Sequence, residues 1–390
     1  IPGNDIYLSL DYGLQKVVSD ELAGKRAALV AMDPNTGEIL AFVSNPSFDP
    51  NPFISGISAK EYKALQQDPD MPLYNRALQG QYPPGSSIKP IEGLAGIHYG
   101  IMGWDSSIYD PGYFSLPGDS HKFRDWKKSG HGNVNLHKSV VESVDTYYYK
   151  LSYQLGIDRL HDWMTRFNFG SKTGIDLPGE KTGVYPSTEW KMKTYKKAWL
   201  PGETISVSIG QGYFLATPLQ IANGIAMLAG DGQHLTPHLL KKSTGAEHVT
   251  PIEKPDGKIQ YNGNPNDWQR MHLAMEDVVK KGTAHNIYTP TYRIAGKTGT
   301  AQVKSIAQGK RYNEAALDSR HWDHGWFVGF APVENPQIAI AVIVENGRHG
   351  GWVAPIVRKM MDYWLIDKIK KPIVPPSPEE LVKINSLSFY

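Results

Sequence analysis

Strand-like segments lie near the two ends of the chain with a long section of helices and loops between them, and this arrangement constrains the fold most. Near the start, residues 27–33 and 38–44 are largely apolar and are joined by Pro34-Asn35-Thr36-Gly37, which is typical of a hairpin turn. Three further strands are expected over residues 292–303, 325–332 and 337–345. Because short links join antiparallel strands, the simplest closure is one five-stranded antiparallel sheet made from both ends of the chain.

The section between the strands, within about residues 86–290, is predicted to form a helical lobe beside the sheet. Helices are expected over residues 86–99, 139–155, 158–167, 217–229 and 350–366. The predicted fold class is therefore α+β, a five-stranded antiparallel sheet flanked by helices, with residues 1–370 as one domain and residues 371–390 as an extended tail. A cleft between the sheet and the lobe is the default place for a catalytic site.

Composition excludes several classes of function. Lys and Arg number 41 against 39 Asp and Glu, so the formal charge of +2 gives no sign of a nucleic-acid partner. The chain has no cysteine, which excludes disulfides, thiolate metal sites and a cysteine nucleophile. The longest apolar run, residues 338–344, is far too short to span a membrane. Because the chain begins at Ile1 rather than at a methionine, we expect a fragment of a longer protein.

Ser86 and Lys89 form the first of three short motifs that point to acyl-transfer chemistry. They stand three residues apart, so on a helix they share one face. Pro84 and Gly85 come directly before them and favour a helix start, which would put Ser86 at the positive end of the helix dipole. A serine hydroxyl needs a base to become a nucleophile, and a partly desolvated lysine can serve. Taken alone, a serine in this place is more often a helix cap.

The other two motifs are Ser143-Val144-Asp145 and Lys297-Thr298-Gly299-Thr300. In the first, Ser143 could relay a proton to a leaving group, and Asp145 could hold Lys89 or a substrate amide. In the second, a lysine and hydroxyls on a strand beside a cleft suit a substrate carboxylate, and Gly299 would let a substrate approach the backbone closely. Each motif is weak alone, and their order and spacing together are specific.

Together the three motifs resemble the Ser-x-x-Lys, Ser-x-Asn and Lys-Thr-Gly set of penicillin-binding proteins and serine β-lactamases. Other segments extend the similarity over about residues 3–368 to class B penicillin-binding proteins, and most of all to their elongation-specific subgroup. These segments are YPPGSSIKP, DPGYF, RDWKKSGHG, GIDLPGE, SIGQGYFLATPLQIAN, AGKTGTAQV and FAPVENPQIAIAVIVENG. The resemblance implies that this chain is the transpeptidase domain, without the N-terminal anchor and non-catalytic module of that family.

The resemblance also implies a peptidoglycan D,D-transpeptidase that β-lactams acylate. Ser86 would attack the penultimate D-Ala carbonyl of a stem peptide, Lys89 would take the hydroxyl proton, and Ser143 would pass a proton to the leaving D-Ala. Backbone N–H groups of Ser86 and Thr300 would form the oxyanion hole. An amine of a second stem would then resolve the acyl-enzyme, and no cofactor is required. The terminal carboxylate would be held by Lys297, Thr298 and Thr300.

One position departs from the family pattern, because the second motif ends in Asp145 rather than in Asn. In the implied scheme Lys89 must be neutral when it accepts a proton, whereas Lys297 stays charged to hold a carboxylate. Burial and a nearby cation would lower the pKa of Lys89, and Asp145 would raise it. Whether Asp145 donates to the substrate amide, accepts from a lysine, or is protonated stays open.

Asp110, Asp125 and His131 form a second constellation, whose oxygen and nitrogen donors suit Zn²⁺. Proteins that this chain resembles hold zinc with two Asp, one His and one Cys, and Val144 stands at the Cys position here. Asp110, Asp125 and His131 are therefore candidate ligands of a structural zinc ion that lacks its fourth protein ligand. The alternative of polar surface residues and helix caps without a metal is favoured.

Two other functions share the three motifs. A serine β-lactamase would need a water activator for deacylation, and the sequence does not identify one. A non-catalytic β-lactam sensor is disfavoured by the intact Ser86, Lys89, Ser143 and Lys297. By resemblance, the full-length protein is expected in the bacterial inner membrane, with a periplasmic catalytic domain that acts in lateral wall elongation and rod shape. Its expected partners are peptidoglycan stem peptides, β-lactams, a SEDS-family glycan polymerase and rod-shape scaffold proteins.

Overall fold

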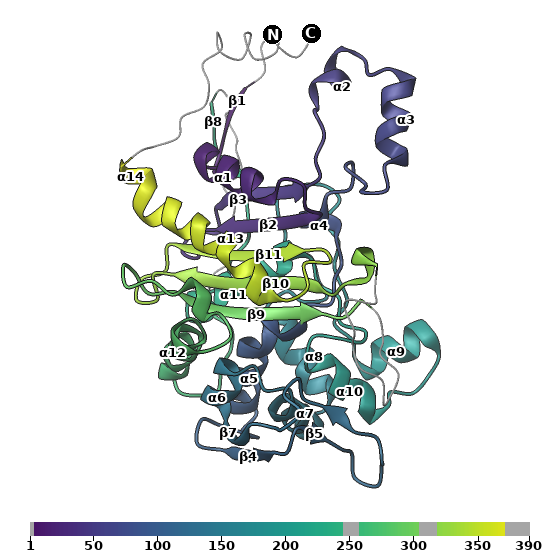
Figure 1. The fold of residues 1–390 in the computed structure, drawn as a ribbon, viewed down its shortest axis with the longest axis vertical. Helices are drawn as coiled ribbons and strands as arrows, with labels where there is room; N and C mark the ends of the chain where they lie inside the picture. Colours follow the sequence, from purple (N-terminus) through teal and green to yellow (C-terminus); the bar gives the residue numbers. More distant parts are fainter. Residues whose placement is uncertain (1–3, 245–256, 304–317, 371–390) are drawn as a thin grey trace.

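A five-stranded antiparallel sheet forms the centre of the computed structural model, which describes residues 4–244, 257–303 and 318–370 (Figure 1). The strand order is β3-β2-β11-β10-β9, so the first and last parts of the chain build one sheet. The predicted α+β fold with this sheet is confirmed. The strands are β2 (Ala27–Met32), β3 (Ile39–Asn45), β9 (Ala295–Ala301), β10 (His324–Ala331) and β11 (Ile338–Val344).

The two ends of the chain meet where β2 pairs with β11, with Ala27 opposite Val344 and Met32 opposite Ala339. Every residue of these two strands is buried, which explains why their sequences are continuous apolar runs and do not alternate with polar residues. The expected turn between β2 and β3 is present, with Gly37 at a φ of 82°. Among the described strands β9 pairs only with β10, so its other edge faces the lobe.

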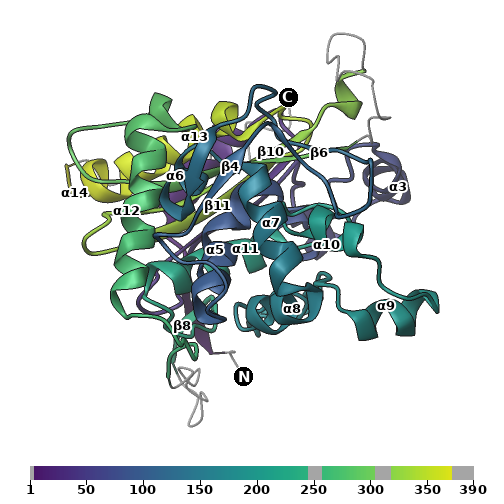
Figure 2. The same cartoon turned by 90° about the horizontal axis from the view of Figure 1, so that it is seen from below.

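The helical lobe lies beside the β9 edge of the sheet and surrounds the helix that follows the first motif. That helix, α5 (Lys89–His98), contacts α6, α7 and α8 (Figure 2). The other helices between the early and late strands are α2 (Asn51–Ser55), α3 (Ala59–Gln67), α4 (Arg76–Gln79), α6 (Leu136–Val141), α7 (Asp145–Leu155), α8 (Ile157–Thr165), α9 (Thr188–Tyr195), α10 (Pro201–Val207), α11 (Pro218–Ala229) and α12 (Asn266–Lys281). Short 3₁₀ turns are η1 (Gly85–Ile88), η2 (His285–Ile287) and η4 (Ser319–His321).

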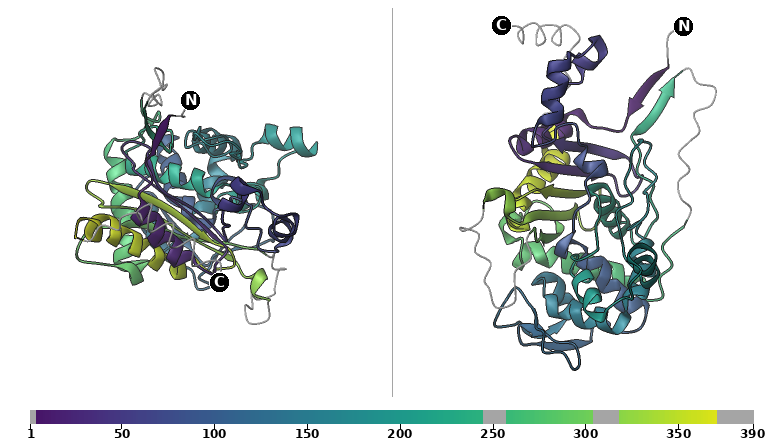
Figure 3. Two further views of the ribbon diagram at one scale, coloured as in Figure 1. Left: turned by 90° about the horizontal axis from the view of Figure 1, so that it is seen from above. Right: turned by 90° about the vertical axis from the view of Figure 1, so that its right-hand side faces the viewer.

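Helices cover both faces of the sheet. On one face lie α1 (Tyr12–Leu22) and α13 (Gly350–Asp362), and on the other lies α11 (Figure 3). A π-helical turn (Tyr363–Asp367) and α14 (Lys368–Lys370) continue α13, so the predicted last helix is present. The predicted tail over residues 371–390 lies outside the described residues, and the division into a domain over residues 1–370 and a tail stays a prediction.

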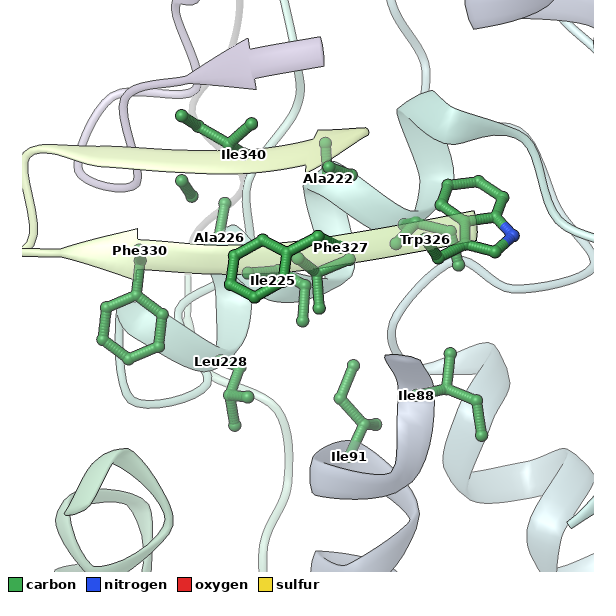
Figure 4. Packing of buried hydrophobic residues seen from close by; sticks show 14 of the residues in the cluster. Ile88, Ile91, Ala222, Ile225, Ala226, Leu228, Trp326, Phe327, Phe330 and Ile340 are labelled. Atoms are coloured by element: carbon green, nitrogen blue, oxygen red, sulfur yellow. The ribbon is translucent and has the colours of Figure 1, made fainter. Parts of the chain in front are cut away.

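The main core lies between the sheet and α11. All of α11 is buried, including its two polar side chains, Gln220 and Asn223, and its other residues are apolar, as expected of a helix in an interior position. Ala222 and Ala226 of this helix lie beside β10 and β11, close to Phe327 and Ile340 (Figure 4). Ile88 and Ile91 extend the core from the sheet into the lobe. The core therefore joins the segment that carries the first motif to the sheet that carries the third.

The prediction of one helix over residues 139–155 is wrong, because two helices, α6 and α7, are separated there at residues 142–144. Ser143 lies in the break with a φ of 56°, in the left-handed region that a helix of L-residues cannot use. That conformation costs about 1–2 kcal/mol for a residue other than glycine, so its surroundings must hold it.

Short strands within the section predicted to be helical were not expected from the sequence. They form the pairs β4 (Ser107–Asp110) with β7 (Gly132–Asn135) and β5 (Tyr113–Phe114) with β6 (Phe123–Arg124). A further one, β8 (Leu240–Thr244), pairs with β1 (Asp5–Leu8), which lies outside that section. Strands this short carry too few residues for a periodic pattern. In the part of the chain that the structure describes, no helix has the length and apolar character needed to cross a membrane.

Candidate active site

The first motif stands in a tight turn between the sheet and the lobe. As predicted, Pro84 and Gly85 precede a helical segment, which starts as η1 and continues as α5. Gly85 has a φ of 57° and donates its N–H to the carbonyl oxygen of Gly210 at 2.9 Å. A Cβ at this position would lie 2.3 Å from the carbonyl oxygen of Thr300. Only glycine therefore allows the turn that carries Ser86 to lie against β9.

Lys89 is fully buried one turn after Ser86 and binds the second motif. Its Nζ donates to Asp145 Oδ1 at 2.6 Å and to the carbonyl oxygen of Ser143 at 2.8 Å. A buried ammonium group needs such partners, because water no longer solvates it. Among the described residues, the hydroxyl of Ser86 makes no hydrogen bond, so its side chain is not held by another part of the site.

The break between α6 and α7 places Ser143 between the two lysines. Its carbonyl oxygen accepts from Lys89, and its Oγ accepts from Lys297 Nζ at 2.8 Å. Asp145, the first residue of α7, reaches Lys89 from the same segment. The structure therefore brings all three predicted motifs together at one point, although they are far apart in the sequence.

Lys297 lies on β9 and is fully buried beneath the cleft. Its Nζ donates to Ser143 Oγ and to the carbonyl oxygen of Thr298 at 3.0 Å. Burial lowers the pKa of Lys297 well below the ordinary value for lysine, and the positive charge of Lys89 lowers it further, while Asp145 opposes the shift. The expected role of Lys297 as a charged ligand for a carboxylate stays a prediction.

A cleft of about 350 Å³ opens above these residues. Lys89 and Lys297 are not among the residues that line it, and their amino groups contact the lining residues Asp145 and Ser143, respectively. From the three motifs, the lining includes Ser86, Ser143, Asp145, Thr298, Gly299 and Thr300.

The backbone of Thr300 faces the turn that carries Ser86. Its carbonyl oxygen accepts a hydrogen bond from Gln211 Nε2 at 3.1 Å, on the side of β9 that faces away from β10. In an antiparallel strand the N–H and C=O of one residue point to the same side. The N–H of Thr300 therefore also points away from β10, toward the turn that carries Ser86, as an oxyanion hole requires.

Several residues of the cleft were not assigned from the sequence. Trp126 and His349 line it, and Thr283 Oγ1 lies 2.7 Å from Thr298 Oγ1. Gly350 approaches so closely that a Cβ there would lie 2.1 Å from the carbonyl oxygen of Trp326. Trp126 belongs to the RDWKKSGHG segment, whereas His349, Thr283 and Gly350 come from loops and helix ends without a local motif, so only the tertiary structure reveals these three.

The candidate metal ligands Asp110, Asp125 and His131 lie together, with one donor atom from each within 4.8 Å of the others. All three are buried, so the alternative that places them on the surface is wrong, whereas its helix-cap part is correct for Asp125. His131 Nδ1 lies 2.6 Å from Glu142 Oε2, and His131 Nε2 lies 3.1 Å from Asp125 Oδ1. The carboxylate oxygens of Asp110 accept from the N–H groups of Gly112 and His131.

These donors fit three positions of a zinc site. A histidine that binds zinc commonly presents its other ring nitrogen to a carboxylate, as His131 does to Glu142. The fourth protein ligand of a structural site is absent at Val144, since that side chain is aliphatic. In addition, Asp125 Oδ2 already accepts hydrogen bonds from the N–H groups of Asp145 and Thr146.

Comparison with known proteins gives consistent matches. A family described as the penicillin binding protein transpeptidase domain matches residues 27–362. The peptidoglycan D,D-transpeptidase MrdA of Acinetobacter baumannii is 61% identical over 373 residues, which are 96% of this chain and 56% of that protein. The chain thus spans little more than half the length of that curated relative.

Solved structures agree with the sequence matches. Pseudomonas aeruginosa PBP2 in complex with WCK 5153 has a TM-score of 0.86 and 48% identity, covering 94% of this chain and 80% of that one. The complex between penicillin-binding protein PBP2 and MreC from Helicobacter pylori contains a chain with a TM-score of 0.80 and 35% identity, covering 93% of this chain and 64% of that one.

Proposed function

Because the chain belongs to the penicillin-binding protein transpeptidase family, in its class B elongation-specific PBP2 branch, we propose that it is a peptidoglycan D,D-transpeptidase. The observation that carries this proposal is the meeting of Ser86, Ser143 and Thr300 at one cleft, with Lys89 and Lys297 directly behind them. The substrates are stem peptides that end in D-Ala-D-Ala, and β-lactams acylate the same serine.

In the first step, Ser86 Oγ attacks the penultimate D-Ala carbonyl carbon and its proton passes to Lys89. A neutral lysine amine has two N–H donors and one lone pair. The two observed hydrogen bonds, to Asp145 Oδ1 and to the carbonyl oxygen of Ser143, use both donors and leave the lone pair for the proton of Ser86. The backbone N–H groups of Ser86 and Thr300 stabilise the oxyanion.

In the second step, the C–N bond to the terminal D-Ala breaks and its nitrogen takes a proton from Ser143. The proton that Lys89 accepted from Ser86 then passes to Ser143, so that Ser143 and Lys89 both return to their starting states. Lys297 donates to Ser143 Oγ, so the hydroxyl hydrogen of Ser143 is free to point into the cleft. Thr298 and Thr300 line the cleft and hold the terminal carboxylate, with the charge of Lys297 behind them. An amine of a second stem peptide then attacks the acyl-enzyme and releases Ser86.

D-Ala release and acyl-enzyme lifetime separate this function from its two alternatives. The purified protein is incubated with a D-Ala-D-Ala stem peptide and, separately, with penicillin. A transpeptidase releases D-Ala and stays acylated by penicillin. Rapid release of hydrolysed penicillin would indicate a serine β-lactamase, and stable acylation without D-Ala release would indicate a sensor.

The same family membership supports a cellular setting. The proposed setting is lateral wall elongation and rod shape, with the catalytic domain on the periplasmic side of the bacterial inner membrane. The partners are a SEDS-family glycan polymerase and rod-shape scaffold proteins. A PBP2–MreC complex from Helicobacter pylori includes a chain that resembles this one, which supports a partner of the scaffold kind.

The proposed acyl transfer requires no cofactor. Asp110, Asp125 and His131 are the residues that would hold a structural zinc ion. Such an ion would link three segments of the lobe and stabilise the fold.

A further inference from the structure

The N-terminus of α7 is capped by a side chain from a distant part of the sequence. Val144, at the N-cap position, makes no side-chain hydrogen bond to the helix. In its place, Asp125 Oδ2 accepts from the N–H of Asp145 at 2.7 Å and from the N–H of Thr146 at 3.1 Å. A carboxylate at this position satisfies two unpaired donors and interacts favourably with the helix dipole. Asp125 thus contacts the segment that carries the second motif.

Asp125 is itself held firmly in the lobe. Its carboxylate is buried, and Oδ1 accepts from the N–H of Lys127 at 3.0 Å and faces His131 Nε2 at 3.1 Å. The N–H of Asp125 donates to the carbonyl oxygen of Gly112 at 2.9 Å. On its other side, the His131 ring contacts Glu142. Both ends of the break between α6 and α7 are therefore tied to the same buried groups.

The residue between those ends needs such support. Ser143 is held in the left-handed region, and a residue other than glycine stays there only when its surroundings impose it. The orientation of Ser143 decides whether its Oγ meets Lys297 and its carbonyl oxygen meets Lys89. The same segment fixes the start of α7, and with it the carboxylate of Asp145 against Lys89.

We propose that Asp125 is a positioning residue for acylation: by capping α7, it holds Ser143 and Asp145 against the two lysines. This inference rests on the proposed acyl transfer by Ser86. Asp125 touches no atom of the nucleophile in the structure and acts through the backbone of the second motif.

Asp110 provides a matched control within the same buried group. Its two oxygens accept from the N–H of Gly112 at 2.7 Å and of His131 at 2.8 Å, and neither donor belongs to the second motif. It is as buried as Asp125 and is equally a candidate zinc ligand. Loss of stability or of a bound metal should therefore affect both positions, whereas loss of the α7 cap should affect only Asp125.

The test compares Asp125→Ala, Asp125→Asn, Asp110→Ala and Asp110→Asn with the unchanged protein. For each protein, stopped-flow labelling with a fluorescent penicillin gives the acylation rate at saturation and the apparent dissociation constant separately. Melting temperature and zinc content are measured on the same samples. Labelling of the unchanged protein at Ser86 must be seen first, and its failure would overturn the proposed function rather than the role of Asp125.

We expect Asp125→Ala to lower the saturating acylation rate by about tenfold to a hundredfold, since small misplacements of catalytic groups have effects of this size. The apparent dissociation constant should stay within about threefold, because Thr298 and Thr300, which are proposed to hold the carboxylate, lie on β9 and not on the segment that Asp125 caps. Asp125→Asn keeps one acceptor oxygen but loses the negative charge at the N-terminus of α7, so it should recover only part of the rate. Both Asp110 variants should acylate within about twofold of the unchanged protein at equal or larger loss of melting temperature.

Equal losses of acylation rate in the Ala variants at positions 110 and 125 would overturn the proposal, because the buried group would then act only through stability or a metal. An unchanged saturating rate in Asp125→Ala would overturn it as well. If Asp125→Ala does not fold, the pair Asp125→Asn and Asp110→Asn decides. A rate no lower in the former than in the latter would contradict the positioning role.

Discussion

The two sides of the cleft each contribute one fully buried lysine, and the two lysines have different surroundings. Lys89, from the lobe, has the carboxylate of Asp145 at 2.6 Å. Among the described residues, the amino group of Lys297, from the sheet, donates hydrogen bonds only to the Ser143 hydroxyl and the Thr298 carbonyl. Burial disfavours a charged amino group, and a carboxylate in contact compensates for it. Equal burial therefore leaves the two amino groups in different electrostatic surroundings.

The different surroundings bear on the protonation states that the proposed reaction requires of the two lysines. The implied scheme needs Lys89 neutral when Ser86 attacks and Lys297 charged when a carboxylate binds. In the free protein, burial lowers the pKa of Lys297, and Lys89 adds to that effect. An arriving substrate carboxylate would act in the opposite direction, because it supplies the negative charge that Lys297 lacks. Carboxylate binding and proton uptake by Lys297 are therefore linked.

The largest change in acylation rate is expected when Lys89 or Lys297 is replaced by arginine, which tests whether the two lysines have different roles. Lys89→Arg keeps the charge but cannot act as a base, because guanidinium does not deprotonate in proteins. The acylation rate at saturating penicillin should fall by about 10²–10⁴-fold, the usual contribution of a general base. Lys297→Arg keeps a partner for a carboxylate and should retain measurable acylation, with part of the loss in apparent affinity.

Acylation rates measured against penicillin concentration decide between the two variants. If Lys89→Arg acylates as well as Lys297→Arg, Lys89 is not the general base. The proton of Ser86 would then leave by another route, with Ser143 and Asp145 as the first candidates.

The pH dependence of the free energy of unfolding tests whether the pKa of Lys297 is lowered in the folded protein. Its pKa in the folded state lies below the value of about 10.4 in the unfolded chain. Between these two values the unfolded chain binds more protons, so the free energy of unfolding rises with pH, by at most about 1.4 kcal/mol per pH unit. Lys297→Met should remove this alkaline rise, as measured by denaturant unfolding.

Lys150→Met on the exposed side of α7 is the control, and it should leave the alkaline rise in place. A rise of the same slope in Lys297→Met and in the unchanged protein would show that Lys297 titrates normally. The lowered pKa of Lys297, which distinguishes it from an ordinary lysine, would then be wrong.

Glu92 lies one turn after Lys89 on α5. Its titration should make the free energy of unfolding fall with rising pH, which is opposite in sign to the effect expected of Lys297. Burial raises the pKa of Glu92 well above its ordinary value, although the charge of Lys89 opposes this. The folded state then keeps a proton that the unfolded chain releases above about pH 4.3, so stability falls as pH rises from there to the folded-state pKa. Glu92→Gln cannot ionise and should gain melting temperature relative to the unchanged protein as pH rises.

Melting temperatures measured at pH values from acidic to neutral test this prediction, with the exposed Glu189→Gln as the matched control. A constant difference between Glu92→Gln and the unchanged protein over that range would contradict the raised pKa. The buried carboxyl would then be ionised beside Lys89.

His131 gives the smallest expected effect, because it acts on the lobe side of the cleft only through Asp125 and Glu142. His131→Ala should lower the melting temperature by about 2–4 °C. We expect elemental analysis of chelator-free protein to find little zinc and a chelator to leave the melting temperature of the unchanged protein unaltered. Near-stoichiometric zinc that is lost in His131→Ala would instead establish a metal site.

Local patterns made much of this structure predictable from sequence. The apolar runs of β2 and β11 and the Pro84-Gly85 pair act within a few residues, so the sheet and the start of the nucleophile helix could be anticipated. The break before α7 could not, because its cap comes from Asp125, far upstream. The burial of Lys297 against Ser143 likewise depends on a contact between residues 154 positions apart.

The role of Ser86 as the nucleophile is tested most directly by the site at which penicillin attaches covalently. The protein is incubated with penicillin, its intact mass is measured, and proteolytic peptides are mapped by mass spectrometry. We expect one adduct, on Ser86, and none in Ser86→Ala. An adduct on Ser87 or Ser143, or persistent labelling of Ser86→Ala, would contradict it.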